Sequence, residues 1–164
     1  MIKHPKIPVP KTLTEKIHDI SAVVIILGMI ITTFIYWREL PQQIAIHFTQ
    51  ESPDQFGGKW VLLLNIAIAI IIYTLTRILA RFPHLLNYPG HVTEENAVKF
   101  YKNGKLLISW INIEIVLIFA LIHWKTIQIS LSENSFLDSF NLLIGFVGII
   151  LTMFIFLIRI MLIK

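Results

Sequence analysis

Four long apolar runs restrict this chain to a membrane-spanning fold. They cover about residues 20–37, 60–79, 106–124 and 140–163, and none contains proline. A helix needs about 20 apolar residues to cross the hydrocarbon core. Only 15% of the residues are charged, against about 25% in soluble domains. The sequence therefore predicts an all-α integral membrane protein, a four-transmembrane-helix bundle that forms a single membrane domain over 1–164.

The first run has two interpretations, a secretory signal peptide or a span that is kept. Its length of about 18 residues exceeds a typical signal-peptide core, and Trp37, Arg38 and Glu39 follow it instead of a small-residue cleavage site. We expect an uncleaved span. Upstream of it, Thr12 and Glu15 have the spacing of a capping box, which predicts a helix that starts near Leu13.

Lysine and arginine are distributed unevenly around the four runs. Eleven lie in the N-terminal segment, around the loop at 80–105 or at the C-terminal end, and three lie in or beside the loops at 38–59 and 125–139. Cytoplasmic loops carry the excess of basic residues. We therefore expect a multi-pass protein of the cell membrane with both termini and the 80–105 loop in the cytoplasm. Trp37, Trp60 and Trp124 would then form an aromatic belt at the outer interface.

The positions of these basic residues also indicate what the protein surface binds. They cluster beside apolar runs, so the anionic headgroups of the bilayer are the expected partner. Nucleic-acid binding has no supporting motif. The chain has no cysteine, which excludes disulfides and thiolate zinc sites. No Walker A, GxGxxG or GxSxG pattern occurs, and no cofactor is predicted.

Both outer loops contain a segment that suits a β-strand. Residues 44–49 are partly β-branched and aromatic, and residues 126–131 alternate polar and apolar side chains with period 2. We expect these two segments to pair as a small β cap on the outer end of the bundle. The alternative is that each is an irregular loop.

Polar and small residues within the runs predict which helix faces meet, because apolar side chains gain little by leaving lipid. At 100° per residue they form a stripe on each run. The stripes are Ser21, Gly28 and Thr32; Asn65, Ala69 and Thr76; Ser109, Asn112, Ala120 and His123; and Gly145, Gly148, Thr152 and Arg159.

Glu114 does not fit the stripe of the third run. A carboxylate at that depth is costly unless it is protonated, paired, or faces water or another subunit. Arg159 is one candidate partner, although it can also extend to the interface. Glu114 is either a proton-linked or ligand-binding site, or a neutral hydrogen-bonded acid at a helix–helix or subunit contact.

The two polar loops hold the other candidate ligand-binding residues. The outer loop carries His47, Asp54 and Lys59, with Glu51 nearby, but their spacing matches no tight zinc pattern and no metal site is predicted. These residues either bind a ligand or position the loop.

In the inner loop, Thr93 resembles an N-cap followed by Glu94, Glu95 and Asn96. A helix that starts there could continue into the third span, with Gly104 as a bend.

At these loops the chain resembles a bacterial membrane family of unknown function, numbered 1648 among such domains. Residues 40–48 are similar to its LPxxIPxHF signature, and residues 53–54 and 57–59 to the PD…GSK that follows. Residues 87–89 and 93–96, with Tyr101 after them, resemble its NYP…TEEN…Y stretch. The resemblance covers about 30–130, with Ala45 where the family usually has proline and Ser52 where it often has glycine.

This family also supplies the N-terminal domain of SdpI-type immunity proteins, which protect Gram-positive cells from a secreted toxic peptide and recruit a repressor to the membrane. The resemblance thus implies a non-enzymatic protein that senses, or gives immunity to, an extracytoplasmic peptide, with a cytoplasmic protein partner at the TEEN loop. Two alternatives remain: a homo-oligomeric transporter or ion-conducting protein that uses Glu114, and a membrane enzyme that uses His47 and Asp54.

Overall fold

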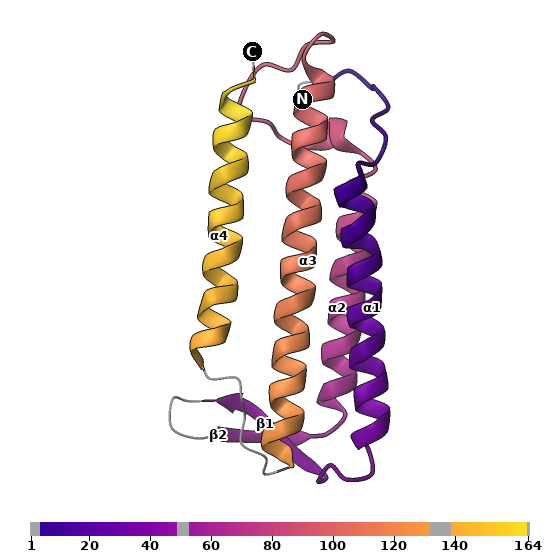
Figure 1. Ribbon diagram of the computed structural model, residues 1–164, viewed down its shortest axis with the longest axis vertical. Helices are drawn as coiled ribbons and strands as arrows, with labels where there is room; N and C mark the ends of the chain where they lie inside the picture. Colours follow the sequence, from indigo (N-terminus) through magenta and orange to yellow (C-terminus); the bar gives the residue numbers. More distant parts are fainter. Residues whose placement is uncertain (1–3, 49–52, 132–138, 164) are drawn as a thin grey trace.

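The computed structural model describes residues 4–48, 53–131 and 139–163. Four α-helices, one short 3-10 helix and one β-hairpin make up this part of the chain (Figure 1). The elements are α1 (Leu13–Tyr36), β1 (Gln43–Phe48), β2 (Pro53–Gly58), α2 (Val61–Leu79), the short 3-10 helix η1 (Pro83–Leu85), α3 (Ala97–Ser130) and α4 (Ser139–Met161). All four α-helices are long and apolar enough to cross a membrane, which confirms the predicted four-helix membrane fold.

Both chain ends lie at one end of the bundle and the hairpin lies at the other (Figure 1). We call these the termini end and the hairpin end. Helix α3 is central, because α1, α2 and α4 all pack against it. Helix α4 makes its main contact with α3 and stands apart from α1 and α2 (Figure 1). The bundle is therefore three packed helices with a fourth docked on one of them.

The first helix begins where the sequence predicts. The backbone N–H of Thr12 donates to the Glu15 carboxylate at 2.7 Å, and the Glu15 N–H donates to the Thr12 hydroxyl at 3.2 Å. This reciprocal pair satisfies two amides that no helical turn can satisfy, so it fixes the start of α1 at Leu13.

The buried face of α1 differs from the predicted stripe. It consists of Glu15, Ala22, Ile26, Met29 and Thr33. Ser21, Gly28 and Thr32 are only half-buried. The Thr32 hydroxyl donates to the Gly28 carbonyl of its own helix at 2.9 Å, so it needs no partner helix. Ala22 and Ile26 of the buried face pack against Ile113 and Val116 of α3.

The small sheet is confirmed, but its predicted second strand is wrong. β1 pairs antiparallel with β2, and residues 126–131 instead extend α3 to Ser130. Pairing with the next segment along the chain closes a much shorter loop, which costs less entropy. Ile127 is fully buried beside Leu40, Ile44 and Leu62, so the end of α3 packs under the hairpin as a helix.

Helix α3 starts at Ala97, four residues after the predicted N-cap Thr93. Thr93 and Asn96 first close a turn, in which the Thr93 N–H donates to the Asn96 side-chain oxygen at 2.8 Å. From Ala97 the helix runs without interruption through Gly104, so the glycine is not a bend.

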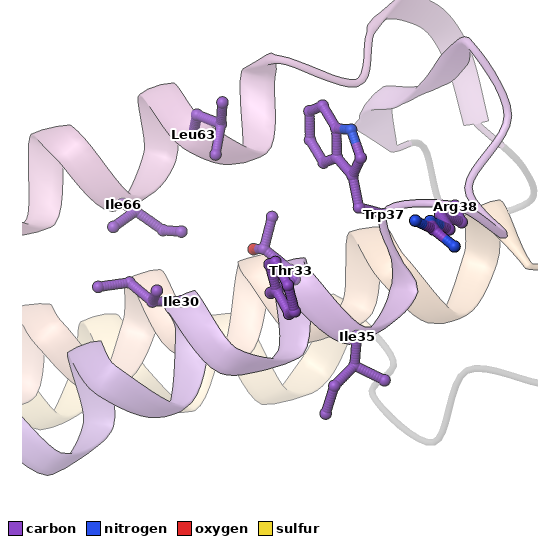
Figure 2. A pocket seen from close by; sticks show the side chains of 8 residues that line it. Ile30, Thr33, Ile35, Trp37, Arg38, Leu63 and Ile66 are labelled. Carbon is purple, nitrogen blue, oxygen red and sulfur yellow. The ribbon is translucent and has the colours of Figure 1, made fainter.

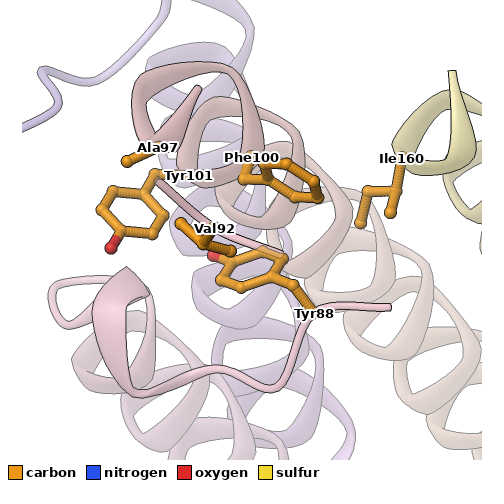
Figure 3. Packing of buried hydrophobic residues seen from close by; sticks show 6 residues of the cluster. All are labelled: Tyr88, Val92, Ala97, Phe100, Tyr101 and Ile160. Atoms are coloured by element: carbon orange, nitrogen blue, oxygen red, sulfur yellow. The ribbon is translucent and has the colours of Figure 1, made fainter. Parts of the chain in front are cut away.

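Gly104 instead makes room for Tyr88. A Cβ atom at position 104 would lie 2.8 Å from the Tyr88 hydroxyl oxygen. Tyr88 belongs to a buried cluster with Val92, Ala97, Phe100, Tyr101 and Ile160 that closes the termini end (Figure 3). Burial raises the pKa of Tyr88 above its ordinary value, so the hydroxyl stays protonated and donates to the Pro83 carbonyl at 2.9 Å.

Gly104→Ala should destabilise the protein, because Tyr88 has to move out of its hydrogen bond to make space. Overpacking of this kind costs about 1–3 kcal/mol. The matched control is Gly28→Ala, since nothing lies within 4 Å of a Cβ at Gly28. The free energy of unfolding in detergent micelles measures both effects. Equal stability of the two variants would contradict the close contact.

Candidate functional site

Lys59 fastens the hairpin to the end of α1. Its ammonium group donates to the carbonyl oxygens of Trp37 at 2.9 Å and Leu40 at 3.4 Å. It also lies 4.9 Å from the centre of the Trp37 ring, a cation–π distance. This predicted ligand-binding residue therefore holds the hairpin in place.

His47 lies on β1, opposite Gln55 of β2, and its side chain is exposed. The ladder is irregular on both sides of His47. Such irregularities bend a strand and redirect its side chains. Asp54 belongs to β2, and its side chain lies outside the described residues. Among the residues that the structure describes, no cluster of three His, Asp or Glu could hold a metal ion.

A pocket of about 700 Å³ lies between α1 and α2 beside the hairpin (Figure 2). Its lining residues are Ile30, Thr33, Phe34, Ile35, Trp37, Arg38, Leu63 and Ile66. Most of this lining is apolar, and Arg38 brings a cation to it. The sequence did not reveal this pocket, because its two walls are faces of helices that are about 30 residues apart.

A buried polar pair borders the pocket. The Thr33 hydroxyl donates to the Met29 carbonyl at 2.9 Å and lies 2.9 Å from Nε2 of His123. Since the hydroxyl proton is already used, His123 donates from Nε2, and its Nδ1 is left as a buried acceptor with no partner among the described residues. This pair links the pocket wall on α1 to α3.

Glu114 lies where α3 meets α4. Its Oε1 accepts a hydrogen bond from the Thr152 hydroxyl at 2.5 Å, and its buried Oε2 has no hydrogen-bond partner among the described residues. Arg159, the candidate partner, is exposed and lies over the Phe156 ring at 4.9 Å. The structure thus gives Glu114 a hydroxyl partner on α4 in place of a cation.

The three inner-loop candidates differ in their surroundings. Glu94 and Glu95 are exposed, whereas the half-buried Asn96 also donates to the His91 carbonyl at 3.1 Å. Asn96 shapes the turn before α3, which leaves the two carboxylates on the surface of the termini end.

Residues 24–72, which include the hairpin and the pocket lining, match a family described as Domain of unknown function (DUF1648). Over this stretch the chain is similar to that family. The stretch runs from Val24 in α1 through the hairpin to Ile72 in α2, and the resemblance expected from the sequence is confirmed there. The motifs at 87–101 lie outside the matched stretch. No curated protein and no solved structure matches the chain significantly.

The stretch that matches DUF1648 contains the whole pocket. All eight lining residues fall between 24 and 72, as do His47, Asp54 and Lys59. The pocket and its neighbouring hairpin therefore lie within the matched stretch, while Glu114 and the inner-loop carboxylates belong to other parts of the chain.

Lys59→Met should loosen the hairpin, because two carbonyl acceptors lose a charged donor. Amide hydrogen exchange of β1 and β2 is expected to rise at least about tenfold, as hydrogen bonds to charged groups contribute about 1.5–3 kcal/mol. Lys102→Met, which removes an exposed lysine at the termini end, is the control. Unchanged exchange in Lys59→Met would show that the strand pairing alone holds the hairpin.

Thr152→Val should weaken the attachment of α4 to α3, since Glu114 loses its donor while the side-chain shape is kept. The expected loss is about 1 kcal/mol in the free energy of unfolding in micelles. Thr74→Val is the matched control, because the exposed Thr74 hydroxyl donates only to the carbonyl of Ile70 in its own helix. A larger loss with Thr74→Val than with Thr152→Val would rule out this role.

Proposed function

We propose that this protein is a non-enzymatic membrane receptor that binds an amphipathic peptide at the hairpin end, as a sensing or immunity protein does. The pocket between α1 and α2 is the observation that carries the proposal. It is large enough for several apolar side chains, and it lies wholly within the stretch that matches DUF1648. Apolar lining with a few polar groups is typical of ligand sites.

The chemistry of the pocket indicates the peptide that fits. Isoleucine and leucine side chains of α1 and α2 would bury its apolar face, while the Arg38 guanidinium would pair with an acidic group. The exposed Ile46 and Phe56 of the hairpin offer further apolar contacts beside it. The ligand is therefore an amphipathic peptide with an acidic group near its apolar residues.

The charge distribution supports an extracytoplasmic site. The excess of lysine and arginine at the termini end favours that end at the cytoplasm, which puts the hairpin end outside. The exposed Glu94 and Glu95 at the termini end would then be available to a cytoplasmic protein partner.

The other two functions have less support. The Thr152 hydrogen bond accounts for Glu114 as a helix contact, so a transport role would need a further observation. Since the side chain of Asp54 is outside the described residues, nothing in the structure supports its pairing with His47 in an enzyme site.

Filling the pocket should abolish binding. Leu63→Trp places a large ring among the lining residues, whereas Leu64→Trp adds the same ring to a neighbouring exposed leucine that does not line the pocket. The probe is a dye-labelled acidic amphipathic peptide, measured by fluorescence anisotropy on protein in phosphatidylcholine nanodiscs, with empty discs as the blank. We expect Leu63→Trp to weaken binding about tenfold, because apolar burial is lost, and Leu64→Trp to change it less than twofold.

Equal effects of the two variants, or no binding above the empty discs, would overturn the proposal. A survival assay then distinguishes an immunity protein from a sensing protein. Bacteria that express the protein are challenged with membrane-active peptides. Protection that Leu63→Trp removes and Leu64→Trp keeps indicates immunity. Peptide binding without protection indicates sensing.

A further inference from the structure

A second cavity, of about 460 Å³, lies at the termini end and has an entirely different lining. Its residues are Lys6, Ile7, Pro8, Val9, Lys11, Arg77, Ala80, Arg81, Pro83, His84 and Lys105. We propose that this basic cavity is a binding site for a phosphate group, carried by an anionic phospholipid at the membrane surface.

The fold brings the cations together from distant parts of the chain. Residues 4–12 cross the termini end as a strap, which Tyr101 and Lys105 of α3 hold through its carbonyl oxygens. The Tyr101 hydroxyl donates to Pro5 at 2.6 Å, and the Lys105 ammonium group donates to Val9 at 2.7 Å. This attachment sets the strap lysines opposite the end of α2, where the arginines of the cavity lie.

The cavity keeps an excess of positive charge after its internal pairs are formed. Lys11 and Arg77 both contact the carboxylate of Asp19 at 2.8 Å. Lys105 lies 3.6 Å from Glu15, a fully buried carboxylate. Two carboxylates thus compensate three cations in part.

Lys6 and Arg81 add to this excess. Both side chains are exposed, and neither forms an ion pair among the described residues. The cavity wall therefore offers two cations that no carboxylate of the described residues neutralises.

Arg77 also has unused hydrogen-bonding capacity. Its Nε and Nη2 engage Asp19, while the buried Nη1 has no hydrogen-bond partner among the described residues. A buried donor without an acceptor is costly, so an anion in the cavity would improve the surroundings of this guanidinium. Arginine also suits phosphate recognition, because its planar fork can donate two hydrogen bonds at once.

The position of the cavity favours a lipid over a soluble anion. Arg77 is in the last turn of α2, and exposed apolar residues stand nearby in the sequence, namely Ile78, Leu79, Phe82 and Leu85. A phosphate in the cavity could therefore continue into acyl chains along α2. Basic pockets at the cytoplasmic ends of membrane helices are suited to anionic lipid headgroups.

Native mass spectrometry of the delipidated full chain tests this site with phosphatidylglycerol, phosphatidylcholine and inorganic phosphate as probes. We expect phosphatidylglycerol to bind more tightly than phosphatidylcholine. Lys6→Gln and Arg81→Gln should each weaken phosphatidylglycerol binding about fivefold, the effect of losing one cation beside an anionic headgroup. Lys16→Gln is the matched control, because Lys16 is exposed on α1 and does not line the cavity.

A competition experiment with inorganic phosphate distinguishes a lipid headgroup from a free phosphate. Inorganic phosphate that fails to displace phosphatidylglycerol supports the lipid, and inorganic phosphate that displaces it supports a free phosphate in the same cavity. The site is overturned if Lys16→Gln weakens binding as much as Lys6→Gln and Arg81→Gln do, or if the two lipids bind equally. The unfolding temperature of each variant shows whether it is folded. Lys6→Gln and Arg81→Gln test the site separately, because the two residues lie in different parts of the chain.

Discussion

The structure depends on hydrogen bonds that α3 makes to the three other α-helices. Ser109 and His123 contact side chains of α1, Asn112 contacts Thr76 of α2, and Glu114 accepts from Thr152 of α4. Two further amides donate to backbone carbonyls: Asn65 of α2 to Phe119, and Asn103 of α3 to Phe156. In lipid, apolar burial contributes little to helix association. The polar groups of α3 therefore determine which helices pack together and with which faces.

The two ends of the bundle offer opposite chemistry. At the hairpin end, Lys59 is occupied by carbonyl groups, and the open space beside it is mostly apolar. At the termini end, the open space is lined by cations from the strap and from α2. We therefore propose a different class of ligand for each cavity, a peptide with an apolar face at one end and a phosphate at the other. The bundle between them holds the two sites apart.

Features that arise from neighbouring residues could be predicted from the sequence. The four spans follow from hydropathy, and the start of α1 follows from the spacing of Thr12 and Glu15. The second strand could not be identified, because burial of Ile127 under the hairpin outweighs the β-type alternation of 126–131. Neither cavity was foreseen either. The pocket depends on how α1 and α2 are rotated relative to each other. The basic cavity depends on a strap that is held through its backbone carbonyl groups. Carbonyl groups are the same in every residue, so the sequence does not indicate such an attachment.

The Asp19–Arg77 ion pair has a consequence for biosynthesis. It joins α1 to α2 directly, whereas in the described part of the chain His18, Thr33 and Asn65 of these helices find their partners on α3. During synthesis α1 and α2 leave the ribosome before α3. In that interval a single ion pair, together with the short hairpin between them, can align the two helices while Thr33 and Asn65 still await their partners. The Asp19–Arg77 pair is thus a contact between α1 and α2 whose formation does not require α3.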